Sequence, residues 1–107
     1  MMPERNGRLA LFKLSMSEAV AHQIKAVIEE ATSLGLGAAA RAALLRILAR
    51  IRKDPLDVGE LRNAHANLNL LVHVVVDLPV VVHFAINPDQ KFVIIQKVFL
   101  APSGSQE

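Results

Sequence analysis

The sequence predicts an α+β fold in which a helical hairpin packs on one face of a mostly antiparallel, four-stranded sheet. Three β-forming runs with few charges fill the C-terminal half: Leu68–Val76, Val80–Ile86 and Phe92–Leu100. Two helical segments precede these runs, and a short strand at Arg8–Leu14 comes before the helices. The expected order of elements is therefore β-α-α-β-β-β, within one domain that spans residues 1–107.

The two ends of the chain, residues 1–7 and 102–107, are polar and are expected to be flexible. Half of the residues (52%) are apolar, but with four Phe and no Trp or Tyr the core must be aliphatic. The absence of cysteine excludes disulfides and thiolate chemistry and is typical of a cytoplasmic protein. The net charge of +2 gives no overall attraction to nucleic acid or to an anionic membrane.

The stretch Leu70–Ile86 is apolar but does not predict a membrane span. It is shorter than the roughly 20 residues that a spanning helix needs. His73, Asp77, Pro79 and His83 also interrupt it. Two strands joined at Leu78-Pro79 are the better interpretation, because the segment is rich in β-branched residues.

The first helix is predicted to begin at Ser15, because Ser15-Met16-Ser17-Glu18 fits a capping box. Its apolar face comprises Val20, Ile24, Val27, Ile28, Ala31 and Leu34. Gly35 and Gly37 end the helix and allow a tight reversal.

The second helix is predicted over Ala38–Lys53 and stops at Asp54-Pro55, since the residue before proline is disfavoured in helical geometry. Its buried face comprises Leu44, Ile47, Leu48 and Ile51. The following segment, Leu56–Asn67, is interpreted as a polar connection.

Two adjacent helices can cover only one face of the sheet, and an uncovered apolar face usually marks an interface. The residues that we assign to this interface are Leu71, Val75, Val81, Ala85, Val93, Ile95 and Phe99. The expected partner is another protein or a second copy of this chain. The alternative is that the C-terminal tail or the Leu56–Asn67 segment folds over the face.

His73 and His83 are expected on the same face, because they occupy comparable positions in neighbouring antiparallel strands. Such a pair could act as general bases or metal ligands, or could be structural or interfacial. No third ligand lies on that predicted face, so neither a metal nor another cofactor is expected. With Lys97 and Arg62 they are the candidate catalytic residues, although no complete catalytic set emerges.

Arg46, Arg50 and Lys53 repeat at helical spacing and form a cationic stripe that Arg62 could extend. The stripe could contact phosphate or an acidic partner segment. Its cations could equally form a solvated face, favoured near the C-terminal end of a helix by the macrodipole.

The chain resembles the RelE/ParE superfamily of toxin–antitoxin toxins, also called plasmid-stabilisation proteins. The resemblance extends over Leu9–Leu100 and is carried by Ile51-Arg52-Lys53-Asp54-Pro55, by Gly59-Glu60-Leu61-Arg62 and by the three strands that follow. It implies an antitoxin-like protein partner, a homodimer, or both.

Members similar to RelE cleave messenger RNA on the ribosome with Arg and Lys on the sheet and a Tyr or His near its end. ParE-like members poison DNA gyrase and lack that set. Here Asn69 and His73 stand where basic residues would be expected. At the end of the last strand, Phe99-Leu100-Ala101-Pro102 replaces the Arg-rich segment of those toxins.

The resemblance therefore implies a divergent member that acts through protein–protein binding without nuclease activity. The first alternative is a ribosome-dependent mRNA endoribonuclease with a rearranged site, for which the available residues are Lys91, Lys97, His73, His83 and Arg62. The second alternative is a homodimeric structural or adaptor module.

Overall fold

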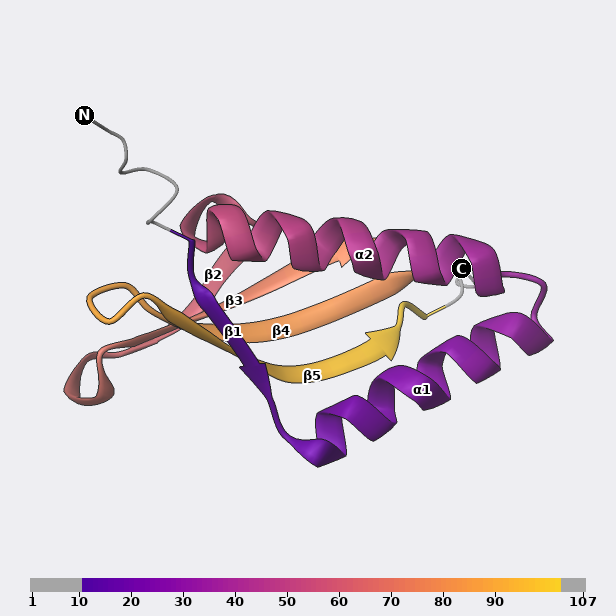
Figure 1. Ribbon diagram of the computed structural model, residues 1–107, viewed down its shortest axis with the longest axis horizontal. Helices are drawn as coiled ribbons and strands as arrows, with labels where there is room; N and C mark the ends of the chain where they lie inside the picture. Colours follow the sequence, from indigo (N-terminus) through magenta and orange to yellow (C-terminus); the bar gives the residue numbers. More distant parts are fainter. Residues whose placement is uncertain (1–10, 103–107) are drawn as a thin grey trace.

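The computed structural model describes residues 11–102, in which two helices pack on one side of a five-stranded sheet (Figure 1). The elements are β1 (Lys13–Met16), α1 (Glu18–Ser33), α2 (Gly37–Lys53), β2 (Glu60–His65), β3 (Leu70–Asp77), β4 (Val80–Asn87) and β5 (Phe92–Leu100). The strand order is β1-β5-β4-β3-β2, with β1 parallel to β5 and the other neighbours antiparallel. The predicted α+β class is confirmed, and the predicted elements occur in the predicted order, with β2 as one further strand.

The sheet has one strand more than the four that the sequence predicts. β2 lies within the segment Leu56–Asn67, for which the sequence pattern predicts a polar connection. All six of its residues are exposed, because β2 is an edge strand paired only with β3. A strand without a buried face has no alternation of apolar and polar residues. β2 therefore depends on its pairing with β3 and not on a local sequence pattern.

The first helix begins two residues later than the capping box predicts. Ser15 belongs to β1, where it pairs with Ile94, and Ser17 is the N-cap. The Ser17 hydroxyl accepts a hydrogen bond from the Val20 amide at 3.1 Å. The start of the predicted Arg8–Leu14 strand and the chain ends at 1–7 and 103–107 lie outside the described residues.

The turn between the helices is at Gly35, as predicted. Its φ of +78° is in the left-handed region that glycine adopts readily. The amide of Leu36 donates to the Ala31 carbonyl at 2.7 Å, which closes the end of α1. Leu34, placed on the buried face by the sequence, is 62% exposed because it is the C-cap.

The helices cover different strands of the same face. In Figure 1, α1 lies along β5, whereas α2 runs over β4 and β3. Within residues 11–102, neither helix has the length and apolar character needed to cross a membrane.

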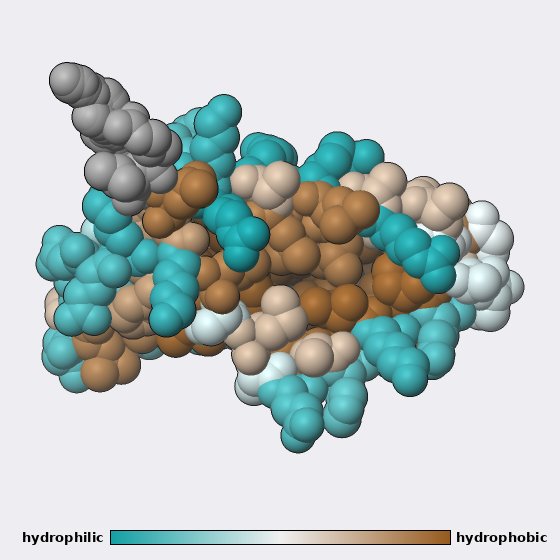
Figure 2. Space-filling model, viewed as in Figure 1, coloured by the Kyte–Doolittle hydropathy of each residue, from teal (hydrophilic) through white to brown (hydrophobic). Residues whose placement is uncertain are grey.

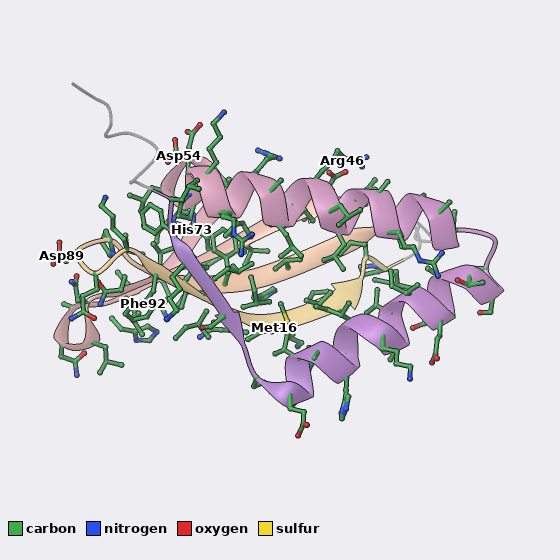
Figure 3. All side chains as sticks on the ribbon, in the orientation of Figure 1. Met16, Arg46, Asp54, His73, Asp89 and Phe92 are labelled. Carbon is green, nitrogen blue, oxygen red and sulfur yellow. The ribbon has the colours of Figure 1, made fainter. Side chains whose placement is uncertain are left out.

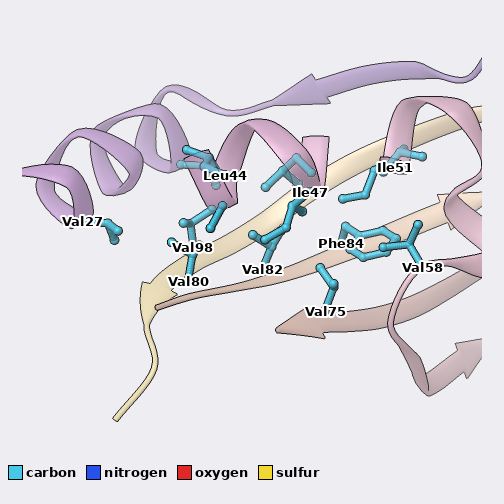
Figure 4. Packing of buried hydrophobic residues seen from close by; sticks show 14 of the residues in the cluster. Val27, Leu44, Ile47, Ile51, Val58, Val75, Val80, Val82, Phe84 and Val98 are labelled. Carbon is cyan, nitrogen blue, oxygen red and sulfur yellow. The ribbon is translucent and has the colours of Figure 1, made fainter. Parts of the chain in front are cut away.

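The core lies between the helices and the sheet and is mainly aliphatic. Figure 4 shows Ile47 and Ile51 of α2 above the side chains of β4, where Val82 and Phe84 are fully buried. α1 contributes Val20, Val27 and Ala31, and Phe84 is the largest fully buried side chain. The predicted buried face of α2 is confirmed for Leu44, Ile47 and Ile51, with Leu48 partly buried.

Replacing Ile47 by alanine should lower the free energy of unfolding by about 2–5 kcal/mol, because it leaves a cavity under α2. Leu45→Ala, two residues away on the same helix, is the matched control, since Leu45 is 69% exposed. Urea denaturation followed by circular dichroism measures both. Equal losses would contradict the placement of Ile47 in the core.

Candidate functional site

The sheet face that points away from both helices, here called the open face, has a defined arrangement of side chains. Residues opposite one another in the register share a face, so the side chains form rows across the strands. One row is Val76–Val81–Phe99, and a second is Asn63–Val72–Ala85–Ile94–Ser15. Between them runs Glu60–Val74–His83–Lys97, which carries the ionisable groups.

Four of the seven predicted interface residues are on the wrong face. Leu71, Val75, Val93 and Ile95 point to the helices, and the last three are buried in the core there. Val81, Ala85 and Phe99 lie on the open face as predicted.

Two features of the register explain this error. β3 pairs with β4 so that Val75, not Val76, is opposite the buried Val82. In β5 the register shifts at a bulge, so that Ile95 pairs with Phe84 while Lys97 pairs with His83. The bulge leaves Gln96 as the extra residue and puts Ile95 and Val98 on the same, buried face.

Part of the open face is hollowed into a groove of about 500 Å³. Its lining comes from four strands and comprises Arg62, Val72, Val74, Val76, Val81, His83 and Phe99. Val76 is 56% exposed at one end of the groove, whereas Val81 is buried at its floor.

Two of the four candidate catalytic residues, Arg62 and His83, line this groove, and a third, Lys97, lies beside His83. His83 lies opposite Lys97 in the register, and Arg62 reaches the groove from the edge strand β2. The centres of the His83 and Phe99 rings are 5.5 Å apart, and Lys97 Nζ lies 5.2 Å from the centre of the Phe99 ring. Arg62 Nη2 is 3.9 Å from a carboxylate oxygen of Glu60, with both side chains largely exposed.

The surroundings of His83 favour its neutral form. Burial against the valines lowers the pKa of its imidazole, and the positive charges of Lys97 and then Arg62 lower it further. A neutral imidazole keeps one nitrogen free to accept a proton or a hydrogen bond.

His73, the fourth candidate, lies on the opposite face, so the predicted His73–His83 pair does not exist. Figure 3 shows it below the C-terminal end of α2. Its Nδ1 is 3.0 Å from the carbonyl oxygen of Val58, and because a carbonyl only accepts, that nitrogen carries the proton. The centre of its ring lies 5.6 Å from the centre of the Phe84 ring, and His73 is 5% exposed. His73 is a structural residue that ties the segment before β2 to the sheet.

The cationic stripe of α2 is partly neutralised within the molecule. Arg46 Nε and Nη2 donate to the two carboxylate oxygens of Asp77 at 2.8 and 2.9 Å. The hydrogen bonds hold the pKa of Asp77 below its ordinary value. Arg46 is therefore a link between α2 and the end of β3, rather than an available contact for phosphate.

The other members of the stripe remain accessible at the sheet edge. Arg50 and Arg62 line a common depression of about 460 Å³ with Gly59 and Glu60, so Arg62 does extend the stripe. Lys53 lines a smaller depression beside Asp54 and Asp57. Acidic neighbours at both places weaken the positive potential of this edge.

A second apolar surface lies on the helix side and was missed by the sequence analysis. A groove of about 380 Å³ is lined by Leu14 of β1 and by Leu45, Leu48, Ala49 and Arg52 of α2. Figure 2 shows this side of the molecule, with an apolar hollow between the two helices. The signal in the sequence is the repeat of Leu45, Leu48 and Ala49 at i, i+3 and i+4, beside the buried stripe.

Residues 11–102 contain no group of three or more His, Asp or Glu side chains arranged to hold a metal ion. The open face therefore offers an apolar floor, one neutral imidazole and flanking cations. Such a set can bind an apolar surface that carries negative charge.

Comparison with known proteins gives a match in structure but none in sequence. No family model matches the chain, and a search of curated proteins finds no match. Among solved structures, a chain from the "Chromosomal ParDE TA system from P. aeruginosa" superposes with a TM-score of 0.60 at 9% identity. The superposition covers 87% of this chain and 99% of that chain. The protein therefore shares the fold of that chain, and a toxin–antitoxin fold is what the resemblance implied.

The His83 imidazole should titrate below the ordinary histidine value, and replacing Lys97 by glutamine should raise its pKa by removing one repelling charge. NMR titration of the imidazole protons measures both effects. Lys25→Gln on the exposed side of α1 is the control and should leave the titration of His83 unchanged. An upward shift of the same size in both variants would contradict the placement of Lys97 beside His83.

Proposed function

We propose that this protein acts by binding another protein through the open face of its sheet, without nuclease activity. The observation that carries the proposal is the groove on this face, which valines from two strands and Phe99 line while both helices lie on the other side. Accessible apolar surface of this kind is typical of protein interfaces.

The fold supports a toxin–antitoxin role for this binding, because the similar structure is described as a ParDE system. In that role the partner is an antitoxin-like protein. Toxins and antitoxins of this kind are commonly encoded side by side, so the first partner to test is the product of the neighbouring reading frame. A homodimer through the same face is the other arrangement that the proposal accommodates.

Cleavage of messenger RNA is the second candidate, and one observation favours it. Arg62 and His83 line one groove and Lys97 lies opposite His83 in the register, so the imidazole could act as a general base and the cations could stabilise a phosphate. Against it, His73 is buried on the other face and Arg46 is paired with Asp77. Lys91 is also removed from this site, because its ammonium lies 5.2 Å from the centre of the Phe12 ring.

Val76→Glu should weaken the complex with the neighbouring gene product, or the homodimer, about tenfold or more, because it places a charged side chain in an apolar interface. Val76 is 56% exposed, so the variant should remain folded. Light scattering and titration calorimetry on the purified proteins measure the effect.

The matched control for this experiment is Leu45→Glu, which puts the same charge on an exposed leucine of the helix side. It should leave the complex intact. Loss of the complex in the Leu45 variant but not in the Val76 variant would move the interface to the helix-side groove and contradict the proposal.

Purified protein added to translating ribosomes should leave the messenger RNA intact, as measured by primer extension beside a RelE-like nuclease as positive control. The expectation follows from the incomplete set of catalytic groups on the open face. Cleavage that disappears in His83→Ala would establish the second candidate instead. His22→Ala, on the exposed side of α1, controls for nonspecific effects of removing a histidine.

A further inference from the structure

We infer that the open face selects an extended partner segment in which an acidic side chain lies between two apolar ones, with the acid placed beside His83, Lys97 and Arg62. This inference rests on the proposed function and specifies the chemistry of its partner. It follows from the order of the rows on the face, from their charges and from the contacts of Phe99 with Lys97 and His83.

The spacing of the rows fits such a segment. The ionisable row lies between the Val76–Val81–Phe99 row and the row that contains Val72 and Ala85. Along β3 and β4, successive rows on one face are two residues apart, or about 6.6–6.8 Å. Alternate side chains of an extended peptide have the same spacing. A peptide along the strands would therefore place an apolar residue, an acid and another apolar residue on the three rows.

The charges of the middle row favour an acid at the central position. Lys97 and Arg62 are cationic, and Glu60, the acid within this row, is 3.9 Å from Arg62. The salt bridge between Glu60 and Arg62 is long and solvent-exposed, so a partner carboxylate could compete with Glu60. Lys97 lies opposite His83 in the register. Its Nζ makes a cation–π contact with Phe99, 5.2 Å from the centre of the ring.

A nucleic acid is a poorer occupant of the same face. Bases of single-stranded RNA are commonly held by stacking on aromatic rings. Phe99 and His83 are aromatic rings that line this groove, and they pack on each other with ring centres 5.5 Å apart. Lys97 Nζ lies 5.2 Å from the centre of the Phe99 ring. An apolar residue of a peptide needs only the edge of such a ring, whereas a stacked base needs its free face.

Binding of the acid should be coupled to protonation of His83. The charged groups around His83 are Lys97 from β5 and Arg62 and Glu60 from β2, while β3 presents Val74. Burial, and then the charges of Lys97 and Arg62, lower the pKa of the free imidazole. A partner carboxylate would raise it, so the affinity should be greater below the pKa of the bound state and fall as the pH rises through it.

The test uses the full chain with two capped pentapeptides, Leu-Thr-Glu-Thr-Leu and its counterpart with Gln in place of Glu. NMR titration should show the Glu peptide binding roughly tenfold more tightly at pH 6, the difference expected for a charge-assisted contact. This preference should shrink at pH 8. Inorganic phosphate and a short oligouridine are titrated in parallel.

The variants His83→Gln and Lys97→Gln separate the two parts of the inference. Lys97→Gln should reduce the preference for Glu over Gln at both pH values. His83→Gln should abolish the pH dependence, whereas His22→Gln on α1 should retain it. Circular dichroism confirms that each variant is folded.

Each other result overturns the inference. Equal binding of the two peptides would remove the preference for an acid but leave the open face as an interface, which Val76→Glu tests independently. Tighter binding of oligouridine than of either peptide would assign the groove to nucleic acid. Failure of both peptides to bind at millimolar concentration would show that the row does not recognise an extended acidic segment.

Discussion

The packing of two helices on one side of a five-stranded sheet is the constraint on which the rest of the molecule depends. Ile47 and Ile51 of α2 pack on the side chains of β4, while α1 lies along β5. Burial of these side chains supplies the main favourable free energy of folding. The same packing leaves the opposite face of the sheet without a helical cover, so one arrangement both stabilises the domain and exposes its groove.

The bulge in β5 determines which side chains reach that groove. It shifts the register between Ile95 and Lys97, so that Ile95 is buried and Lys97 comes to lie beside His83. The Oε1 of Gln23 on α1 accepts a hydrogen bond from the Val98 amide at 3.0 Å. This bond fixes the strand just after the bulge. Bulges often redirect side chains near functional sites, and this one places Lys97 on the open face.

In the RelE/ParE resemblance, the shared fold and the functional residues are separate questions. The fold is shared with a chain of a ParDE system at a TM-score of 0.60, whereas 9% identity leaves the functional residues free to differ. Fold does not determine function, so the side chains of the groove decide what this chain can bind. The proposal that the groove holds a charged peptide rests on its apolar floor, on His83 and on the two flanking cations.

The sequence by itself determined the α+β class, both helices and the three C-terminal strands, because apolar periodicity, Gly35 and Asp54-Pro55 act locally. It also indicated correctly that one sheet face would lack a helical cover. Only the tertiary structure decided the edge strand β2, the separation of His73 from His83, and the face to which Ile95 belongs. These depend on strand register, and a shift of one residue moves a side chain to the other face. Register is set by contacts between distant segments, which a local pattern does not contain.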